Sequence, residues 1–416
     1  MGREGTPARA GDGLPAGRGV GGADAGAAPA LPADLGTDAL AVTGGAEEPG
    51  LAARRVAAAS IRAQILGILL AWGMPEDLAN TTAEVMSETD LMGVDSHGIS
   101  MLMLYERMRL AGQLRLQARP RVVRENACTA LVDGGAGLGH PVGVMAMRLA
   151  VEKSLAAGIG AVGVFNSHHF GAAGYYARLA TERGLLAMVT SSARGVLVVP
   201  TRGAIPVLGT NPIAFGAPAG RSRPVVLDIA TSTVAANKVK VYDLRGKTLP
   251  EGWVVDEAGR SVADASMAME YLYRRAEGGL TPLGGTPDTG SHKGYGLALM
   301  AQILGATLTG GSFSPLRESR RTQADEPDNV GHFFMAVEPR AFRPPGAFED
   351  DMDAMIDVLH GTRPADPDRP VLVPGEPEDL ARAERLRDGV PIPPALDWHV
   401  RDICERSGVA YVLQDR

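Results

Sequence analysis

The sequence predicts an α/β fold in which a mixed sheet, with helices packed on it, is flanked at both chain ends by helical segments. Three observations favour this fold class. Apolar residues between 56 and 112 recur at helical spacings, and the segments from 128 to 191 alternate between strand-like and helix-like patterns. Two further helical patterns, at 380–387 and 398–406, lie near the C-terminus.

The composition excludes several classes of protein. The chain has 416 residues, of which 45% are hydrophobic and 21% charged, and its net charge is −7. This composition is typical of a globular protein and argues against a large nucleic-acid footprint. Its apolar stretches are far shorter than the roughly 20 residues of a membrane helix. Two cysteines, Cys128 and Cys404, make no disulfide framework, so a reducing, cytoplasmic location is expected.

The first 55 residues differ from the rest. The first 50 hold 13 glycines and 12 alanines and no aromatic residue. Such a segment cannot bury enough apolar area to offset its ordering entropy, so residues 1–55 are predicted to be a disordered tail.

A helical domain is predicted over residues 56–122. Ile61, Ile65 and Leu69 mark one face of a first helix, and Pro75 opens a second that runs towards Met92. A third helix is expected at 99–110. The family resemblance given below implies that residues from about 376 to 416 complete this domain.

The segment 123–375 is predicted to form the mixed α/β domain. Strand patterns, helix patterns and one surface loop follow one another along it. Strands are expected at 129–133, 159–165, 185–191, 207–208, 213–215, 225–228 and 333–337, helices at 142–157, 171–183 and 295–308, and the loop at 317–330. Pro212 and the short spacings around it indicate antiparallel or edge strands.

The glycine-rich segment 133–139 does not match a dinucleotide fingerprint. It stands between a strand and a helix, but the Gly-x-Gly-x-x-Gly pattern fails at His140 and at Val142. No acidic residue follows about 20 residues on, near 162–165. The sequence therefore favours a flexible strand–helix turn here over a classical Rossmann site.

Two histidine clusters are candidates for proton transfer. Asp95-Ser96-His97-Gly98 lies between two helices, and Asn166-Ser167-His168-His169 lies between a strand and a helix. Histidine exchanges protons near neutral pH, and α/β sheets place ligands beyond strand ends. Two other interpretations stay open at this point: capping or structural residues, and zinc ligands.

Two helix starts could hold an anion. His292 and Lys293 open one helix, where free backbone N–H groups and a lysine would suit a phosphate or carboxylate. The segment 373–377 opens another, and its simpler interpretation is a turn followed by an N-terminal glutamate.

Eight motifs in this order resemble those of the type-2 malate/L-lactate dehydrogenase family, which includes ureidoglycolate and sulfolactate dehydrogenases, diketogulonate reductase and piperideine-2-carboxylate reductase. The resemblance covers about residues 56–410. The motifs are Asp95–Gly98, Asn166–Gly171 with Tyr175 and Tyr176, Gly209–Phe215, Leu227–Ser232, Leu249–Trp253, His292–Gly296, Gly331–Phe334 and Pro374–Glu376.

The resemblance implies an NAD(P)-dependent oxidoreductase that interconverts 2-hydroxy and 2-oxo acids. It implies a homodimer whose cofactor, NAD or NADP, binds a non-Rossmann mixed-sheet domain packed on an all-helical domain from both chain ends. His97 and His169 would be the catalytic proton donor and acceptor, and no metal is expected. The implied cofactor contacts are Leu227, Asp228, Ile229, His292, Lys293, Pro374, Gly375 and Glu376.

Two departures from the family pattern bear on the substrate. Family members often have Arg four residues after the first motif histidine, where it can hold the substrate carboxylate, and this chain has Met101 there. Either Arg194 or Lys238 substitutes for this arginine, or the substrate differs from that of the family members. The usual Thr-Asn-Ser after the third strand is replaced by Ser191-Ser192-Ala193, which keeps hydroxyl groups near the expected nicotinamide.

Three alternatives to this function follow from the same residues. One is a non-catalytic relic that acts as a binding or structural protein, which the two departures would favour. Another is a reductase of a cyclic imino acid. The third is a metal hydrolase that uses Asp95, His97 and His169.

Overall fold

The computed structural model describes residue 2, residues 53–323 and residues 325–416. The prediction of a disordered tail concerns residues that almost all lie outside this part. The strand β1 (Arg54–Val56) already pairs with β11 (Val390–Ile392), so regular structure begins two residues before the predicted start at 56. The predicted domain boundaries at 122 and 375 stay a prediction.

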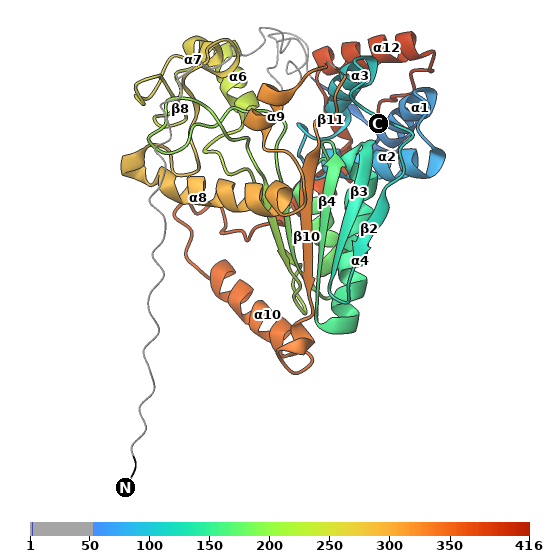
Figure 1. Cartoon of the computed structure of the whole chain (residues 1–416), viewed down its shortest axis with the longest axis vertical. Coiled ribbons are helices and arrows are strands. Elements are labelled where there is room, and N and C mark those ends of the chain that lie inside the picture. The colour runs from blue at the N-terminus through green and yellow to red at the C-terminus, as the bar shows by residue number, and fades with distance from the viewer. Residues whose placement is uncertain (1, 3–52, 324) are drawn as a thin grey trace. The chain divides into compact units, whose positions relative to one another are not determined.

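Helices from both chain ends share one hydrophobic core, as the fold-class prediction requires. The N-terminal helices lie beside the C-terminal ones in Figure 1. Ile61, Ile65 and Leu69 of the first helix are buried in the same cluster as Val400 and Ile403 of the last. The elements are α1 (Ala58–Ala71), α2 (Glu76–Leu91), the 3₁₀ turn η2 (Ile99–Met101), α3 (Leu102–Leu110), α11 (Glu376–Asp388) and α12 (Pro394–Ser407).

A seven-stranded mixed sheet forms the centre of the second layer (Figure 1). Its spatial order is β2-β3-β4-β10-β5-β6-β7, with β3 parallel to β4 and every other pair antiparallel. The strands are β2 (Arg121–Glu125), β3 (Thr129–Gly137), β4 (Ile159–Ser167), β5 (Leu186–Ser191), β6 (Ile213–Ala217), β7 (Val225–Ile229) and β10 (Val330–Val337). The antiparallel strands predicted around Pro212 are confirmed, and β7 lies at the sheet edge.

Different helices cover the two faces of this sheet. The helices α4 (Gly139–Ala157) and α5 (Ala173–Thr181) pack on one face, where a Cβ on Gly160 would collide with α4. The helix α8 (Ser291–Gln302) and its π-helical extension η4 (Ile303–Thr307) pack on the other. Side chains alternate along a strand, so Gly163, three positions after Gly160, faces Thr309 at the end of this extension.

A smaller lobe follows β7. Its core includes the buried Leu249, Val254 and Leu280. The lobe contains α6 (Ala236–Leu244), α7 (Ala265–Tyr273) and the short pair β8 (Val254–Val255) and β9 (Gly279–Leu280). None of these elements was predicted.

Several sequence predictions need correction. The glycines at 134–137 continue β3 and do not form the predicted turn. Residues 207–208 form an isolated bridge, Val198 with Leu208, and no strand. Part of the predicted loop at 317–330 is the helix α9 (Ser314–Arg320), and α10 (Ala347–His360) was missed. The predicted helix at 295–308 starts earlier and changes to π-geometry at Ile303.

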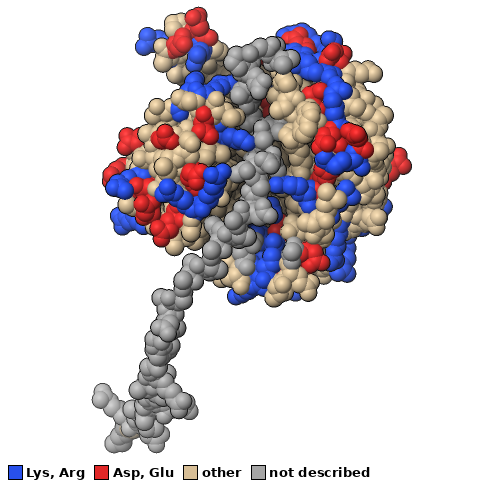
Figure 2. Space-filling view, turned by 90° about the horizontal axis from the view of Figure 1, so that it is seen from above, with Lys and Arg blue, Asp and Glu red and all other residues tan. Residues whose placement is uncertain are grey.

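Among residues 53–323 and 325–416, no helix is long and apolar enough to cross a bilayer. Figure 2 shows acidic and basic side chains interspersed over one face of the described residues.

Candidate active site

His97 and His169 lie against each other although they come from different layers. His97 stands on the turn between α2 and η2, and His169 on the loop after β4. Their ring centroids are 5.2 Å apart. The structure therefore brings the two histidines predicted from the sequence into one site.

A buried carboxylate shapes the turn that carries His97. Asp90, near the end of α2, accepts a hydrogen bond from the backbone N–H of Ile99 at 2.8 Å. A Cβ on Gly98 would overlap the carboxyl of Asp90, so the turn closes only around glycine. Arg385 of α11 holds the same turn from outside through Asp95, with Nη2 to Oδ2 at 3.1 Å. A helix from the N-terminal part of the chain and one from the C-terminal part thus fix the position of His97 together.

Tyr105 holds the ring of His169. Its hydroxyl is 2.8 Å from Nδ1 of His169, and the backbone N–H of Gly171 makes a longer contact of 3.3 Å with the same nitrogen. The Tyr105 hydroxyl can donate or accept, so it supports either neutral tautomer and the imidazolium. Burial raises the pKa of Tyr105 well above its usual value, so the phenol keeps its proton. Nδ1 is occupied, and Nε2 is left for a ligand.

His97 and His169 are more exposed to solvent than three other histidines nearby. His140, His168 and His332 are fully buried, whereas His97 and His169 are only partly buried. In the described part of the chain, Nε2 of His97 and Nε2 of His169 make no hydrogen bond, while Nδ1 of His97 lies 2.6 Å from the Ser96 hydroxyl. Of these five histidines, only His97 and His169 offer a free ring nitrogen that a small molecule could reach.

His332 fixes the floor of the site. It lies on β10, and its two ring nitrogens contact the hydroxyls of Ser191 at 2.8 Å and Ser167 at 3.0 Å. Its ring stacks on Phe170 with centroids 4.5 Å apart. One imidazole therefore ties together the ends of β4 and β5, and it positions the residue that follows His169.

Burial keeps the histidines neutral. It lowers the pKa of His97 to about 4 and that of His169 well below 6.5, where His97, His140 and His332 lower it further. Burial likewise lowers the pKa of His140 and of His332 to about 3. At neutral pH the rings of His97 and His169 are therefore bases.

These shifts predict a loss of stability in mild acid. Each of the four histidines has a folded pKa below its unfolded value of about 6.5, so the unfolded chain binds more protons as the pH falls. The contribution of these histidines to stability is complete above pH 6.5. It is lost as the pH falls towards about 4 for His97 and about 3 for His140 and His332, by up to about 1.4 kcal/mol per pH unit for each histidine. Urea unfolding at pH 7 and pH 5 measures this loss. His140→Gln should reduce the difference, and equal midpoints for the wild type at both pH values would contradict it.

Two of the predicted cofactor segments lie side by side at the edge strand β7. The backbone N–H of Val226 donates to the carbonyl of Pro374 at 2.8 Å, and a Cβ on Gly375 would lie 3.1 Å from the nitrogen of Val226. The carboxylate of Glu376 accepts a hydrogen bond from the nearby backbone N–H of Val373 at 2.8 Å. Leu227–Ile229 and Pro374–Glu376 thus form one surface.

Asp228 is the chemically distinctive residue of that surface. It accepts from the N–H of Gly174, at the start of α5, at 2.6 Å. Burial of the carboxyl raises the pKa of Asp228 to about 6, although the residue as a whole keeps exposed surface. A Cβ on Gly174 would lie 3.0 Å from Asp228 Oδ2, so the carboxylate fits only because position 174 is glycine. Such a carboxylate can accept hydrogen bonds from ribose hydroxyls, so these residues fit a nucleotide.

His292 and Lys293 occupy the first turn of α8, on the other face of the sheet from α5. Both are exposed, and neither side chain makes a hydrogen bond or ion pair with another described residue. The structure leaves them free to bind a ligand but does not join them to the Asp228 surface.

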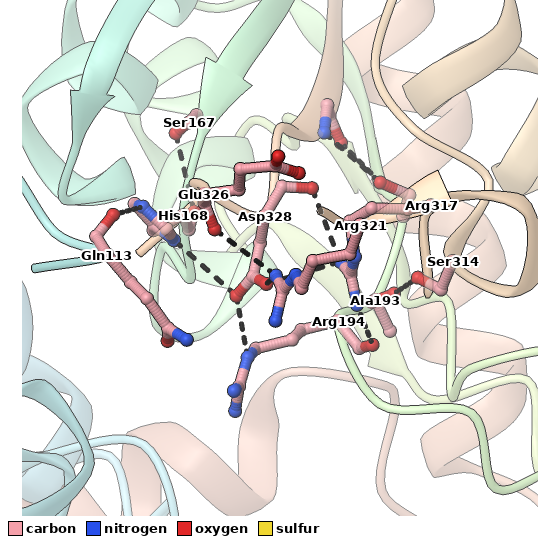
Figure 3. A network of polar contacts seen from close by, with 12 residues as sticks. Gln113, Ser167, His168, Ala193, Arg194, Ser314, Arg317, Arg321, Glu326 and Asp328 are labelled. Carbon is pink, nitrogen blue, oxygen red and sulfur yellow. Dashed lines mark hydrogen bonds and ion pairs between the residues drawn. The ribbon is translucent and has the colours of Figure 1, made fainter. Parts of the chain in front are cut away.

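The sequence prediction missed three residues of this region: Tyr105, His140 and Asp328. Tyr105 lies eight positions after His97, a helical spacing that could have indicated it. His140 packs edge-on against Tyr105, with centroids 5.7 Å apart, and neither of its ring nitrogens has a hydrogen-bond partner in the described structure. Asp328 is fully buried among arginines (Figure 3). Among the described residues, no group of three or more His, Cys, Asp or Glu side chains could hold a metal ion.

A family model described as malate/L-lactate dehydrogenase matches residues 56–399. The chain belongs to this family of oxidoreductases. It is 38% identical to a malate dehydrogenase of Pyrococcus abyssi over 346 residues, which cover 83% of this chain and 92% of the relative. It is 33% identical to an L-sulfolactate dehydrogenase of Methanocaldococcus jannaschii over 346 residues, or 83% and 95% of the two chains. The resemblance inferred from the eight motifs is confirmed.

Solved structures show the same fold as this malate/L-lactate dehydrogenase family member. Malate dehydrogenase from Entamoeba histolytica superposes with a TM-score of 0.80 at 30% identity, covering 86% of this chain and 99% of that chain. A delta1-piperideine-2-carboxylate reductase from Pseudomonas syringae superposes with a TM-score of 0.72 at 28% identity, covering 84% and 99%. The predicted non-Rossmann mixed-sheet fold class is confirmed.

Proposed function

We propose that the protein is an NAD(P)-dependent dehydrogenase that interconverts a 2-hydroxy acid and a 2-oxo acid, with His97 and His169 as its acid–base residues. The observation that carries the proposal is the pairing of these two partly exposed imidazoles, 5.2 Å apart, with the Tyr105 hydroxyl on one of them. A homodimer and a cytoplasmic location are part of the same proposal.

A nicotinamide, when bound, would accept the hydride from C2 of the hydroxy acid or return it. Asp228 would accept hydrogen bonds from its ribose, and Lys293 would offer a positive charge to its phosphates. The hydroxyls of Ser191 and Ser192 are already used by the protein, through His332 and the backbone around Gly331. They therefore shape the site and do not serve as free donors.

His169 supplies the site for the proton. During oxidation its neutral ring accepts the hydroxyl proton at Nε2 while Nδ1–H donates to the oxygen of Tyr105. The contact from Gly171 favours the opposite tautomer, but at 3.3 Å it is longer than an ordinary N–H hydrogen bond. The Tyr105 hydroxyl, 2.8 Å from Nδ1, can accept as well as donate, so it is compatible with the Nδ1–H tautomer that this step requires. His97 lies beside His169, with the ring centroids 5.2 Å apart, and is the second acid–base residue of the pair.

The depressed pKa values suit the oxidation direction. A ring that stays neutral is ready to accept a proton from the substrate. An anionic substrate would raise the pKa of both histidines, because a nearby negative charge favours the imidazolium, and it would help them carry the proton for reduction. The negative charge of the bound substrate and the protonated form of the histidines therefore stabilise each other.

A substrate scan tests the proposal. Malate, lactate, ureidoglycolate, sulfolactate and a cyclic imino acid are each offered with NAD(H) and NADP(H), and the absorbance of the reduced nicotinamide is followed. We expect turnover of at least one 2-hydroxy acid. Reduction of the imino acid alone would favour the reductase alternative. Absence of both turnover and cofactor binding by calorimetry would favour the non-catalytic relic.

Lys293→Ala should chiefly weaken cofactor binding. Loss of one charge-assisted contact to a phosphate costs about 1.5–3 kcal/mol, so we expect Kd for NAD(P)H to rise roughly tenfold or more. Fluorescence titration of the reduced cofactor measures it. Lys247→Ala, at another exposed lysine, is the matched control. Equal Kd in Lys293→Ala and wild type would remove Lys293 from the cofactor site.

A further inference from the structure

Beside His168, the fully buried carboxylate of Asp328 is surrounded by three arginines (Figure 3). Its Oδ2 lies 2.6 Å from Nε of Arg194, and its Oδ1 lies 2.9 Å from Arg321 and 3.5 Å from Arg317. Burial alone would raise the pKa of Asp328, but His168 and the arginines hold it far below its usual range. The carboxylate is therefore a fixed negative charge that anchors the guanidinium groups around it.

Arg194 is anchored differently from its neighbours. Only its Nε pairs with Asp328, and its two terminal nitrogens make no hydrogen bond or ion pair with any described side chain. In Figure 3 these nitrogens point away from the cluster. The side chain is 31% exposed, against 18% for Arg321 and 10% for Arg317. Arg194 thus presents a free, oriented pair of donors, the geometry that binds a carboxylate bidentately.

The sheet places Arg194 at the same edge as the catalytic histidines. Ser191 at the end of β5 lies opposite His332 of β10, and Ser167 at the end of β4 lies opposite Val330, two residues away on the same strand. Both strands run antiparallel to β10, so they end at the same edge of the sheet, and the His332 ring contacts both hydroxyls. His169 comes two residues after Ser167 and Arg194 three residues after Ser191. With β10 between them, the strand ends are two strand spacings apart, about 10 Å. That span matches a small carboxylic acid reached by one side chain from each end.

The Asp328 cluster also connects Arg194 directly to the loop that carries His169. His168, the residue before His169, lies 3.7 Å from Asp328 Oδ2, the same oxygen that holds Arg194. Its Nε2 also donates to the carbonyl of Gln113 at 2.9 Å. The loop that carries His169 and the arginine therefore share one buried anchor.

Other candidates for binding an acid fit less well. Met101 is an apolar side chain packed against the helical core. The ammonium of Lys238 lies over the ring of Trp253, 5.3 Å from its centroid, in the smaller lobe. Neither offers a free cationic group beside the histidines.

We propose that Arg194, oriented by Asp328, binds a carboxylate of the substrate beside His169. The inference rests on the proposed function and identifies the residue that recognises the acid. Asp328 is a positioning residue in this arrangement, because it touches Arg194 and no ligand.

Arg194→Met tests the inference in the enzyme with its cofactor. Because one charge-assisted contact is lost, KM for the 2-hydroxy acid should rise roughly 10- to 100-fold. The kcat and the Kd for the reduced cofactor should stay close to wild type. Arg194→Lys keeps the positive charge but loses the paired N–H donors of the guanidinium, so its KM should lie between those of wild type and Arg194→Met. This variant replaces Arg194→Met in the test if the methionine variant folds poorly. Arg183→Met removes an exposed arginine elsewhere and is the matched control.

Malate and lactate compared in the same variants identify which carboxylate is bound. An equal rise in KM for both acids assigns Arg194 to the carboxylate beside C2. A rise for malate alone assigns it to the second carboxylate. A KM in Arg194→Met that matches Arg183→Met for every acid turned over would overturn the inference.

A binding measurement keeps this test independent of turnover. Calorimetry with oxalate, in the presence of NADH, should give a Kd at least tenfold weaker in Arg194→Met than in wild type. If the wild type binds oxalate in this Arg194-dependent way but oxidises no hydroxy acid, the proposed function is wrong and the inference stands. If oxalate binds both proteins equally, the inference is wrong whatever the activity.

A double-mutant cycle tests the role of Asp328. Asp328→Asn should raise KM in the same direction, and adding it to Arg194→Met should raise KM no further, because both act through one guanidinium. Additive effects on KM would show that Asp328 acts on the substrate site independently of Arg194.

Discussion

His169→Ala should lower kcat about 10²- to 10⁴-fold, the range for losing a positioned acid–base group. The expected cause is the loss of Nε2 at the position that Tyr105 fixes through Nδ1 at 2.8 Å. The cofactor should bind as before, because the Asp228 surface is held by β7 and the Pro374 segment and makes no described contact with His169. Steady-state kinetics and calorimetry with NAD(P)H give the two readouts.

Tyr105→Phe is the informative companion to this variant. It keeps the ring of His169 but removes the hydroxyl that accepts from or donates to Nδ1, so we expect a smaller loss of kcat and a shifted pH–rate profile. A kcat of His169→Ala within about threefold of wild type would remove His169 from the chemistry, since an acid–base residue contributes far more.

Gly98→Ala should damage both stability and activity. The added Cβ would overlap the carboxyl of Asp90, which is itself fixed by the N–H of Ile99. The turn can accept the methyl group only by moving Asp90 or the segment that carries His97. Steric strain in a packed interior costs about 1–3 kcal/mol, and displacement of His97 should lower kcat/KM about 10²-fold.

Chemical denaturation and steady-state kinetics measure the two effects of Gly98→Ala. Gly296→Ala is the matched control, because a Cβ at that position in α8 would meet nothing within 4 Å. We expect the control to be neutral or slightly stabilising, since alanine favours a helix more than glycine does. If Gly98→Ala behaved like Gly296→Ala, the close packing of Asp90 on the turn would not be needed for the site.

The sequence predicted those elements whose residues carry a local signal. The strands at 159–165 and 185–191 alternate regularly, and the helices around Ile61 and Met86 have a continuous apolar face. The helix α10 was missed although Met352 and Ile356 are buried at helical spacing. The start of α7 also carries a signal, because the side chain of Asp264 caps it by accepting from the N–H of Met267.

Other features could not be predicted because they depend on residues far apart in the chain. The glycines at 134–137 look like a turn but extend β3, since Gly137 pairs with Ser167 of β4. The pairing of His97 with His169 followed from a family resemblance and not from spacing. Asp328 and Arg194 carry no motif, and only the adjacency of β4, β10 and β5 brings them together.

The insertion of β10 between β4 and β5 has a consequence for biosynthesis. A ribosome releases both flanking strands long before it reaches residue 330, so the growing chain must keep a gap open at the middle of its sheet. Pairing over such sequence separations is slow, and unpaired strand edges favour aggregation while they wait. The turn that carries His97 waits longer still, because Arg385 is made near the end of synthesis. The site around His97 can therefore assemble only after translation is almost complete. A chain released early would lack the contacts that hold this site together.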